Sequence, residues 1–173
     1  MASKSASDLA SDVTIRCDLR PGDIGRIAAL HGTAYRDEQG AFGLVFEAYV
    51  CKTLAEFVLE NDARGKLWFA ERGDELVACA ALVERRDGER LRGQLRWVLA
   101  DPSARGLGLG RKLVEATIDH ARAIGADEVF LETTAGLDAS MRIYRDLGFV
   151  ETGRAVKQLW RPDTTVIWMS LEL

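Results

Sequence analysis

A glycine-rich run, Arg105-Gly-Leu-Gly-Leu-Gly110, lies between a predicted strand and a predicted helix. Glycine lets the backbone turn sharply and come close to a ligand. The amide groups exposed in such a turn, with the positive end of the following helix, form a site suited to phosphate. Arg105 and Arg111 can add charge-assisted hydrogen bonds. The run therefore predicts an anion-binding loop that joins a strand to a helix.

Two well-known phosphate-binding loops do not match this run. A P-loop ends in Gly-Lys-Ser/Thr, whereas Gly110 is followed by Arg111-Lys112-Leu113. A dinucleotide fingerprint that starts at Gly106 would place its third glycine at Arg111, although Glu132 stands where a ribose ligand should. That fingerprint belongs to a βαβ unit, and an antiparallel meander precedes the loop here. A nicotinamide-dependent enzyme is therefore a weaker alternative, as is a turn that binds nothing.

The spacing of apolar residues predicts one mixed α/β domain with a central sheet. Strands are predicted at residues 13–19, 66–72, 76–84, 93–100, 129–133, 149–158 and 164–171. Helices are predicted over 23–31, 44–60 and 139–147, and from the glycine-rich run to about residue 124. Residues 1–12 are expected to be a disordered tail, which leaves residues 13–173 for the domain.

Charge and cysteine usage narrow the class of protein. The net charge of −4 argues against a general electrostatic attraction to nucleic acid or an anionic membrane. The longest apolar run, Leu76–Val83, is too short to span a bilayer, and the N-terminus lacks the apolar core of a secretory signal. Cys17, Cys51 and Cys79 contain no CxxC pair, so neither a disulfide framework nor a metal site is expected. The expectation is a cytoplasmic protein with no nucleic-acid or membrane partner.

Two motifs resemble those of the GNAT N-acetyltransferase superfamily. Arg105, Gly108 and Gly110 fill its acetyl-CoA-binding pattern, [RQ]-x-x-G-x-[GA]. The segment Ser140–Phe149 resembles its A-x-x-[LI]-Y-x-x-x-G-F signature. The resemblance covers the chain from about Val13 to its end. It implies a single-domain α/β fold, with a mixed central sheet of about seven strands flanked by about four helices.

A narrower resemblance is to the acetyltransferase domains found fused to MarR-type regulators. It is carried by His31-Gly32, by the sequence FEAYV at 46–50 and by RGLGLGRKLV at 105–114. The chain contains no helix-turn-helix segment, so a free-standing catalytic domain is expected.

The resemblance implies acetyl-CoA as co-substrate and no metal. In the family the loop amides hold the cofactor pyrophosphate, and the backbone of the preceding strand binds the pantetheine arm. The residues assigned to the cofactor in this way are Leu99, Ala100, Arg105, Gly106, Leu107, Gly108, Leu109, Gly110, Arg111 and Ser140. Two positions depart from the family pattern: Leu137 replaces a common asparagine that binds the arm, and Asp146 replaces a common basic residue.

Acetyl transfer needs a neutral amine, a positioned thioester and a proton for the departing thiolate. The resemblance assigns the role of proton donor to Tyr144. The strand before the loop lacks the glutamate base of many family members, so Glu132, twelve residues before Tyr144, is the next candidate, with a water chain as the alternative. No cysteine has an evident histidine partner, so direct transfer in a ternary complex is expected.

The acceptor pocket is expected between the first two helices and the last strands. The predicted substrate residues are His31, Tyr35 and Trp97, with Phe42, Trp160 and Trp168 as further candidates by position. The implied acceptor is a small-molecule amine or a protein or peptide amine. A homodimer through an exposed sheet edge is compatible with the pattern. The rival function is a non-catalytic acyl-CoA-binding sensor or partner domain, favoured by Leu137 and by the missing strand glutamate.

Overall fold

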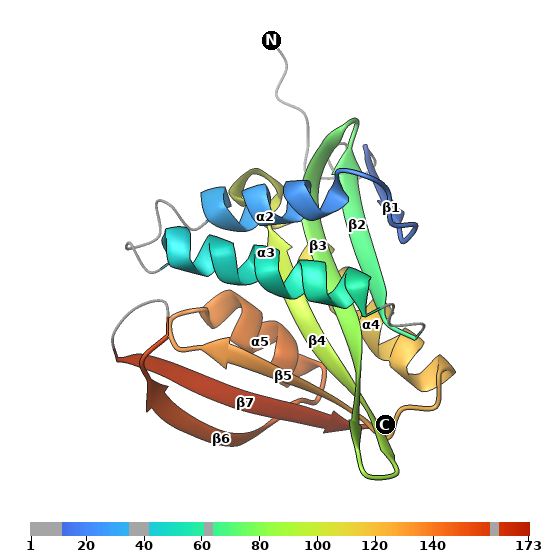
Figure 1. Cartoon of the computed structure of the whole chain (residues 1–173), viewed down its shortest axis with the longest axis vertical. Helices are drawn as coiled ribbons and strands as arrows, with labels where there is room; N and C mark the ends of the chain where they lie inside the picture. Colours follow the sequence, from blue (N-terminus) through green and yellow to red (C-terminus); the bar gives the residue numbers. More distant parts are fainter. Residues whose placement is uncertain (1–11, 35–41, 61–63, 160–162) are drawn as a thin grey trace.

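A seven-stranded mixed sheet forms the centre of the protein (Figure 1). The computed structural model describes residues 12–34, 42–60, 64–159 and 163–173. The strands are β1 (Val13–Arg16), β2 (Lys66–Arg72), β3 (Glu75–Asp87), β4 (Arg90–Ala100), β5 (Glu128–Thr134), β6 (Val150–Lys157) and β7 (Thr164–Glu172). The helices are α2 (Asp23–Ala34), α3 (Leu44–Leu59), α4 (Leu109–Ala123) and α5 (Asp138–Asp146), with a short 3-10 turn, η1 (Pro102–Ala104). The predicted mixed α/β architecture is confirmed, whereas the predicted tail lies almost entirely outside the described residues.

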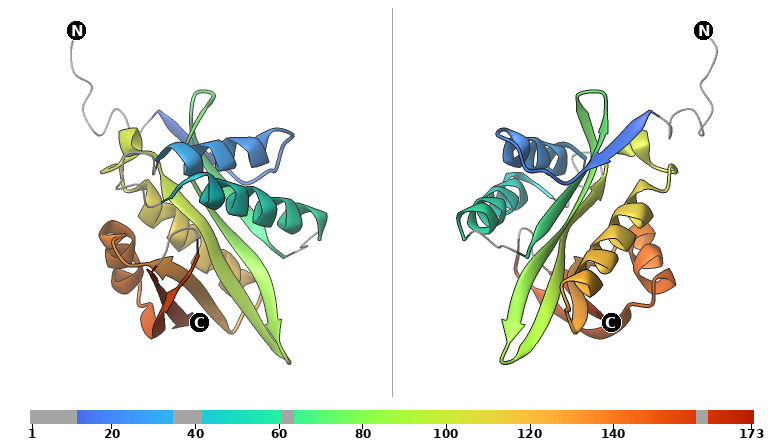
Figure 2. Two further views of the ribbon diagram at one scale, coloured as in Figure 1. Left: turned by 60° about the vertical axis from the view of Figure 1, so that its left-hand side comes forward. Right: turned by 90° about the vertical axis from the view of Figure 1, so that its right-hand side faces the viewer.

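The helices cover the sheet from both sides. Figure 2 shows α2 and α3 on one face and α4 and α5 on the other. Each face has its own apolar core: Ile27, Leu54 and Phe69 belong to the first, and Leu113 and Leu131 to the second. The central strand β3 contributes to both cores, which explains why its sequence is apolar at consecutive positions rather than alternating.

The strand order is β1-β2-β3-β4-β5-β7-β6, and the junction between β4 and β5 is parallel. That junction is short, because its paired residues run only from Arg92 with Glu128 to Gln94 with Phe130. Beyond these pairs the two strands diverge, as Figure 1 shows. β5 continues to pair with β7 along its whole length, so β4 and β5 open a wedge within one continuous sheet.

A β-bulge in β4 lies beside this wedge. Arg96 stands opposite Ala81 and Leu99 stands opposite Cys79, so β4 carries one extra residue between these positions. Trp97, within the bulge, has a positive φ of 48°, an uncommon conformation for a non-glycine residue. The bulge turns both Arg96 and Trp97 toward α3, where they contact its aromatic side chains.

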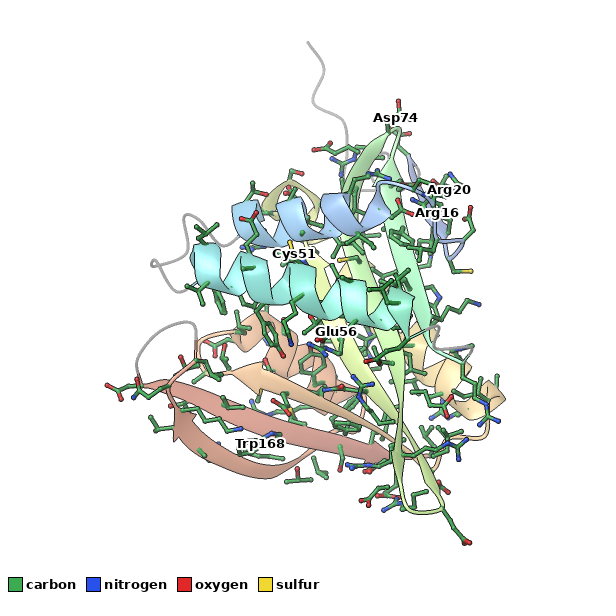
Figure 3. All side chains as sticks on the ribbon, viewed as in Figure 1. Arg16, Arg20, Cys51, Glu56, Asp74 and Trp168 are labelled. Atoms are coloured by element: carbon green, nitrogen blue, oxygen red, sulfur yellow. The ribbon has the colours of Figure 1, made fainter. Side chains whose placement is uncertain are left out.

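A partly buried ionic cluster joins β1, α2 and β2. The Arg16 guanidinium donates hydrogen bonds to both carboxylate oxygens of Asp23 and to both of Glu71, at 2.7 to 2.9 Å. Arg26 adds a further bond to Glu71, and Arg16 also lies 4.2 Å above the ring of Phe69. The cluster fixes the edge strand and the first helix against the sheet (Figure 3).

Several element ends differ from the prediction; in the β3–β4 hairpin, for example, β3 runs to Asp87 instead of residue 84 and β4 starts at Arg90 instead of residue 93. β1 ends at Arg16 rather than at residue 19, so Cys17 lies outside the strand that was expected to hold it. The first helix runs past His31 to Ala34, and Gly32 does not end it. A Cβ at Gly32 would meet the end of the Glu47 side chain of α3, which lies against this position.

Candidate active site

A groove of about 1000 Å³ runs from the end of β4 past the glycine-rich run to the start of α5. We call it the loop groove. Its wall contains most of the residues predicted for the cofactor: Leu99, Ala100, Arg105, Gly106, Gly108, Leu109, Gly110, Arg111 and Ser140. Leu107 instead packs against the apolar core on the α4 face. The structure therefore brings together nine of the ten predicted positions at one surface.

The glycine-rich run has the backbone conformation of an anion-binding turn. Gly106 and Gly108 adopt positive φ angles of 78° and 72°, and Gly108 is the N-cap of α4. The first intrahelical bond runs from the Lys112 N–H to the Gly108 carbonyl oxygen. The amides of Leu109 to Arg111 therefore have no acceptor within the helix, and the helix dipole adds positive potential there. This local geometry fits a diphosphate group.

The two arginines of the run differ in surroundings. Arg105 is exposed on the groove wall. Arg111 is exposed too, but its guanidinium already bonds Glu115 at 3.0 Å and Asp146 at 3.5 Å. A bound phosphate would have to compete for Arg111 with these two carboxylates.

A second hollow, of about 150 Å³, adjoins the loop groove inside the wedge between β4 and β5. We call it the inner cavity. Five residues line both spaces: Phe42, Val98, Leu137, Ser140 and Tyr144. The two spaces therefore form one path that starts at the glycine-rich run and ends between β4, β5 and α3.

Tyr144 lies where the two spaces meet. Its side chain is buried, and its ring stands 5.8 Å from that of Phe149. α5 presents Tyr144 and Ser140 to the path because the two residues are four apart and share one face of the helix. A phenol at this junction can donate a proton to a group that reaches it along the loop groove.

Besides Tyr144 and Ser140, the predicted residues that line the inner cavity include His31, Trp97 and Glu132. Glu132 is exposed, and Trp97 is buried against Phe57 with its indole N–H 3.3 Å from the Thr53 hydroxyl. Tyr35 and Trp160 lie outside the described residues. Trp168, labelled in Figure 3, pairs with Glu132 across β5 and β7 and carries the Lys157 ammonium 4.6 Å from its ring, but it does not line the cavity.

His31 is a buried, neutral base in the cavity wall. Its Nδ1 lies 2.9 Å from the Ile27 carbonyl oxygen, so Nδ1 carries the proton. Burial lowers the pKa of His31 to about 4, although the bond to Ile27 opposes that shift. At neutral pH its Nε2 is therefore an acceptor rather than a donor.

This burial predicts a pH-dependent stability. The folded-state pKa lies below the ordinary value of 6.5, so the unfolded chain binds the proton more tightly. The stability is complete above pH 6.5 and is lost as the pH falls toward 4, by on the order of 3 kcal/mol. Denaturant unfolding of the wild type and of His31→Gln should show a difference in stability that narrows across this range. A difference that stays constant from neutral pH to pH 4 would contradict it.

Thr134 and Arg96 are among the lining residues that were not predicted from the sequence. The Thr134 hydroxyl is buried and has no hydrogen-bond partner within the described part of the chain. Arg96 lies against Trp97 and Tyr49 at the cavity wall. Thr134 follows Glu132 by two positions and so shares its sheet face, and that period was the available signal for Thr134.

Residues 12–34, 42–60, 64–159 and 163–173 contain no group of three metal-ligating side chains. None of the helices in these ranges has the length and apolar character needed to cross a membrane.

Comparison with known proteins agrees with this geometry. The model of the acetyltransferase (GNAT) family matches residues 32–149. The chain is 33% identical to N-acetyltransferase 8F1 of Rattus norvegicus over 103 residues, 58% of this chain and 47% of that protein. It is also 33% identical to the IAA acetyltransferase of Azospirillum brasilense over 84 residues, 49% of this chain and 54% of that protein. The chain thus spans about half the length of these curated relatives.

Two solved structures share the fold. The ribosomal-protein-alanine N-acetyltransferase of Brucella melitensis superposes with a TM-score of 0.71 and 24% identity, over 92% of this chain and 99% of that one. The spermidine N-acetyltransferase of Vibrio cholerae, in complex with CoA and spermine, gives 0.67 and 19%, over 94% and 96%. With a family model that matches two thirds of its length and this shared fold, the chain belongs to the GNAT acetyltransferase family.

Proposed function

We propose that the protein is an N-acetyltransferase that moves an acetyl group from acetyl-CoA to a primary amine. The observation that carries this proposal is the continuous path from the amides at the start of α4 to the Tyr144 side chain. A pyrophosphate at one end and an acyl group at the other match the two ends of that path. The acetyltransferase names of the relatives support the same reaction.

Acetyl-CoA supplies the activated thioester. The glycine-rich run holds the pyrophosphate, and the backbone of Leu99 and Ala100, at the open edge of β4, binds the pantetheine arm. Tyr144 gives its proton to the sulfur as the C–S bond breaks and the N–C bond forms. Glu132, or a water molecule beside it, accepts the proton that the amine loses.

Transfer is direct, without an acyl-cysteine intermediate. Burial raises the pKa of the Cys79 thiol to about 12, so Cys79 is not a nucleophile at neutral pH. Cys17 and Cys51 are exposed, and neither lines the loop groove or the inner cavity. The amine therefore attacks the thioester in a ternary complex.

The acceptor is a small-molecule amine or a protein or peptide amine. Similar folds include the spermidine N-acetyltransferase of Vibrio cholerae and a NatC complex bound to Gag peptide and CoA.

We place the protein in the cytoplasm, without a nucleic-acid or membrane partner. The narrower resemblance to domains fused to MarR-type regulators, the free-standing domain and a homodimer through an exposed sheet edge stay predictions. The alternative, a non-catalytic acyl-CoA sensor, is favoured by Leu137 on the groove wall and predicts binding without turnover.

A thermal-shift titration with acetyl-CoA, CoA and NADH tests the proposed ligand. A ligand at 100 times its Kd adds about 2.7 kcal/mol, which raises Tm by about 5 to 10 °C for a domain of this size. We expect that rise with both CoA species and not with NADH. A rise with NADH alone would revive the dinucleotide alternative, and no rise with CoA species at millimolar concentration would contradict the proposal.

Two glycine variants sharpen the titration. Gly108→Ala and Gly88→Ala each force an L side chain into a positive φ, at a cost of about 1 to 2 kcal/mol. Gly88 lies in the turn between β3 and β4 and is not among the residues that line the loop groove. Gly108→Ala should lose most of the response to acetyl-CoA, and Gly88→Ala should keep it. Release of free thiol with an amine panel then separates an enzyme from a sensor.

A further inference from the structure

The inner cavity carries one positive and one negative side chain on opposite walls. Among its described lining residues the charged groups at neutral pH are Arg96 of β4 and Glu132 of β5. The last paired residues of these strands are Gln94 and Phe130, and each charged residue follows by two positions. Because side chains alternate along a strand, Arg96 and Glu132 lie on the same face of the sheet, one on each side of the wedge.

Opposite charges at cross-strand positions commonly pair. Arg96 and Glu132 form no ion pair with each other, and neither has an ion pair elsewhere in the described ranges. The divergence of β4 and β5 separates them. Arg92, four residues before Arg96 on the same face, is paired with Glu128 where the strands are still joined. The wedge therefore keeps two opposite charges available to a ligand between them.

Arg96 is held ready for a planar anion. Its guanidinium carbon lies 4.9 Å from the Trp97 ring centroid and 5.7 Å from that of Tyr49, and Nη2 donates to the Tyr49 hydroxyl at 3.1 Å. Stacking on aromatic faces restricts the side chain and leaves further N–H groups of the guanidinium to donate. A carboxylate matches the guanidinium geometry, because its two oxygens can accept two parallel N–H···O hydrogen bonds.

The cavity also holds a buried hydroxyl that needs a partner. Thr134 lies two residues after Glu132 and so shares its sheet face, and its Oγ1 is without a hydrogen bond among the described residues. Buried polar atoms are normally bonded, so an unpartnered one in a cavity wall points to a polar ligand. A cavity of about 150 Å³ is large enough for a molecule such as benzene, which is the scale of an amino acid.

We propose that the acceptor is an amino acid or a similar small amine that carries a carboxylate, with Arg96 binding the carboxylate and Glu132 facing the amine. This inference rests on the proposed acetyltransferase function and names its substrate class. Arg96 then selects the acceptor, and it takes no part in the chemical step.

Matched acceptor pairs test this specificity. The pairs are L-leucine with isopentylamine, L-phenylalanine with phenethylamine, and L-leucine with leucinamide, which keeps the α-amine and lacks the carboxylate. Free thiol released from acetyl-CoA is measured for the wild type, Arg96→Gln, Arg96→Lys and Arg122→Gln. Arg122 is an exposed arginine of α4 whose side chain bonds Asp119, and it serves as the control.

The wild type should favour the carboxylate-bearing member in kcat/KM by about 10- to 100-fold, the worth of a charge-assisted hydrogen bond. Arg96→Gln should remove that preference through KM, because it should lower kcat/KM for the carboxylate-bearing acceptors much more than for the amines and the amide, and Arg96→Lys should restore part of the preference. In the presence of CoA, L-leucine and L-phenylalanine should raise the Tm of the wild type and not that of Arg96→Gln.

Several outcomes would overturn the inference. If the kcat/KM of the wild type for the amines equals or exceeds that for the amino acids, the enzyme does not recognise a carboxylate. An equal loss of both members in Arg96→Gln would make Arg96 structural. If thiol is released only with amines or peptides, the acetyltransferase function stands and the acceptor class is wrong. If acetyl-CoA neither raises Tm nor yields thiol, the proposed function fails and this inference fails with it.

Discussion

Tyr144→Phe is expected to lower kcat by about 10²- to 10⁴-fold, the usual contribution of a positioned general acid. The substitution removes one hydroxyl and keeps the buried ring in contact with Phe149. The glycine-rich run stays intact, so the affinity for acetyl-CoA should not change. A loss in kcat without a loss in affinity is the signature of a group that acts in the transition state.

Single-turnover thiol release and a CoA binding titration measure the two quantities separately. Met141→Leu, a similar-volume change at a buried position of the same helix, is the control for packing of α5. Turnover of Tyr144→Phe equal to that of the wild type would remove Tyr144 as the acid. A parallel loss of acetyl-CoA affinity would instead indicate that the hydroxyl supports the groove.

Arg16→Met is expected to lower the free energy of unfolding by about 3 kcal/mol, the lower end of the cost of removing one partner from a buried ion pair. The Asp23 side chain is 2% exposed and that of Glu71 is 12% exposed, so water cannot replace the guanidinium easily. Arg26 keeps its contacts with Glu71 and with Asp23, so each carboxylate retains one of its two cations. The methionine retains most of the apolar contact with Phe69.

Urea unfolding at pH 7 measures this loss, and Arg20→Met is the control. Arg20 also forms an ion pair, with Asp18, but both side chains are more than half exposed, and such pairs contribute about 0 to 1 kcal/mol (Figure 3). Equal effects of the two variants would contradict the assignment of the ionic cluster as a stabilising contact.

The pH dependence supplies a second check. Burial alone would raise the pKa of Asp23, but hydrogen bonds from Arg16 and from the Arg20 amide hold it below its usual value. Hydrogen bonds from Arg16 likewise lower the pKa of Glu71. A depressed carboxyl pKa stabilises the fold above the ordinary value and loses that effect as the pH falls through the folded-state pKa. The deficit of Arg16→Met should therefore shrink in acid.

Local patterns predicted most of the fold. The bounds of β2 and the start of α3 follow from apolar periodicity and flanking glycines, and the structure places them at the predicted residues. The short β4–β5 junction could not be predicted, because it depends on which strands meet across the sheet. The bulge at Trp97 also left no local mark, since a tryptophan at positive φ is held by tertiary contacts with Phe57 and Thr53.

The site was predicted to the extent that it is local in sequence. The glycine-rich run and Tyr144 lie in contiguous motifs, and both stand on the path that the structure shows. Arg96 acquires its surroundings only when β4, β5 and α3 meet, so no spacing in the sequence marks it, whereas the two-residue spacing from Glu132 to Thr134 was a signal. The burial of His31 depends likewise on the packing of α2 against the sheet and α3.

The short junction also divides the sheet along the sequence. Residues before 101 supply β1 to β4, and residues after 127 supply β5 to β7, so each half of the sheet is contiguous in the chain. Three residue pairs, the contacts of Asp127 with Leu91 and the ion pairs of Arg92 with Glu128 and of Arg90 with Glu172 join β4 to the second half in the described structure. We call this junction the seam. We expect the amide hydrogens of the seam to exchange through an opening that costs less free energy than opening the interior of either half. A ligand bound along the seam would tie the halves together and slow amide exchange in strands that it does not touch.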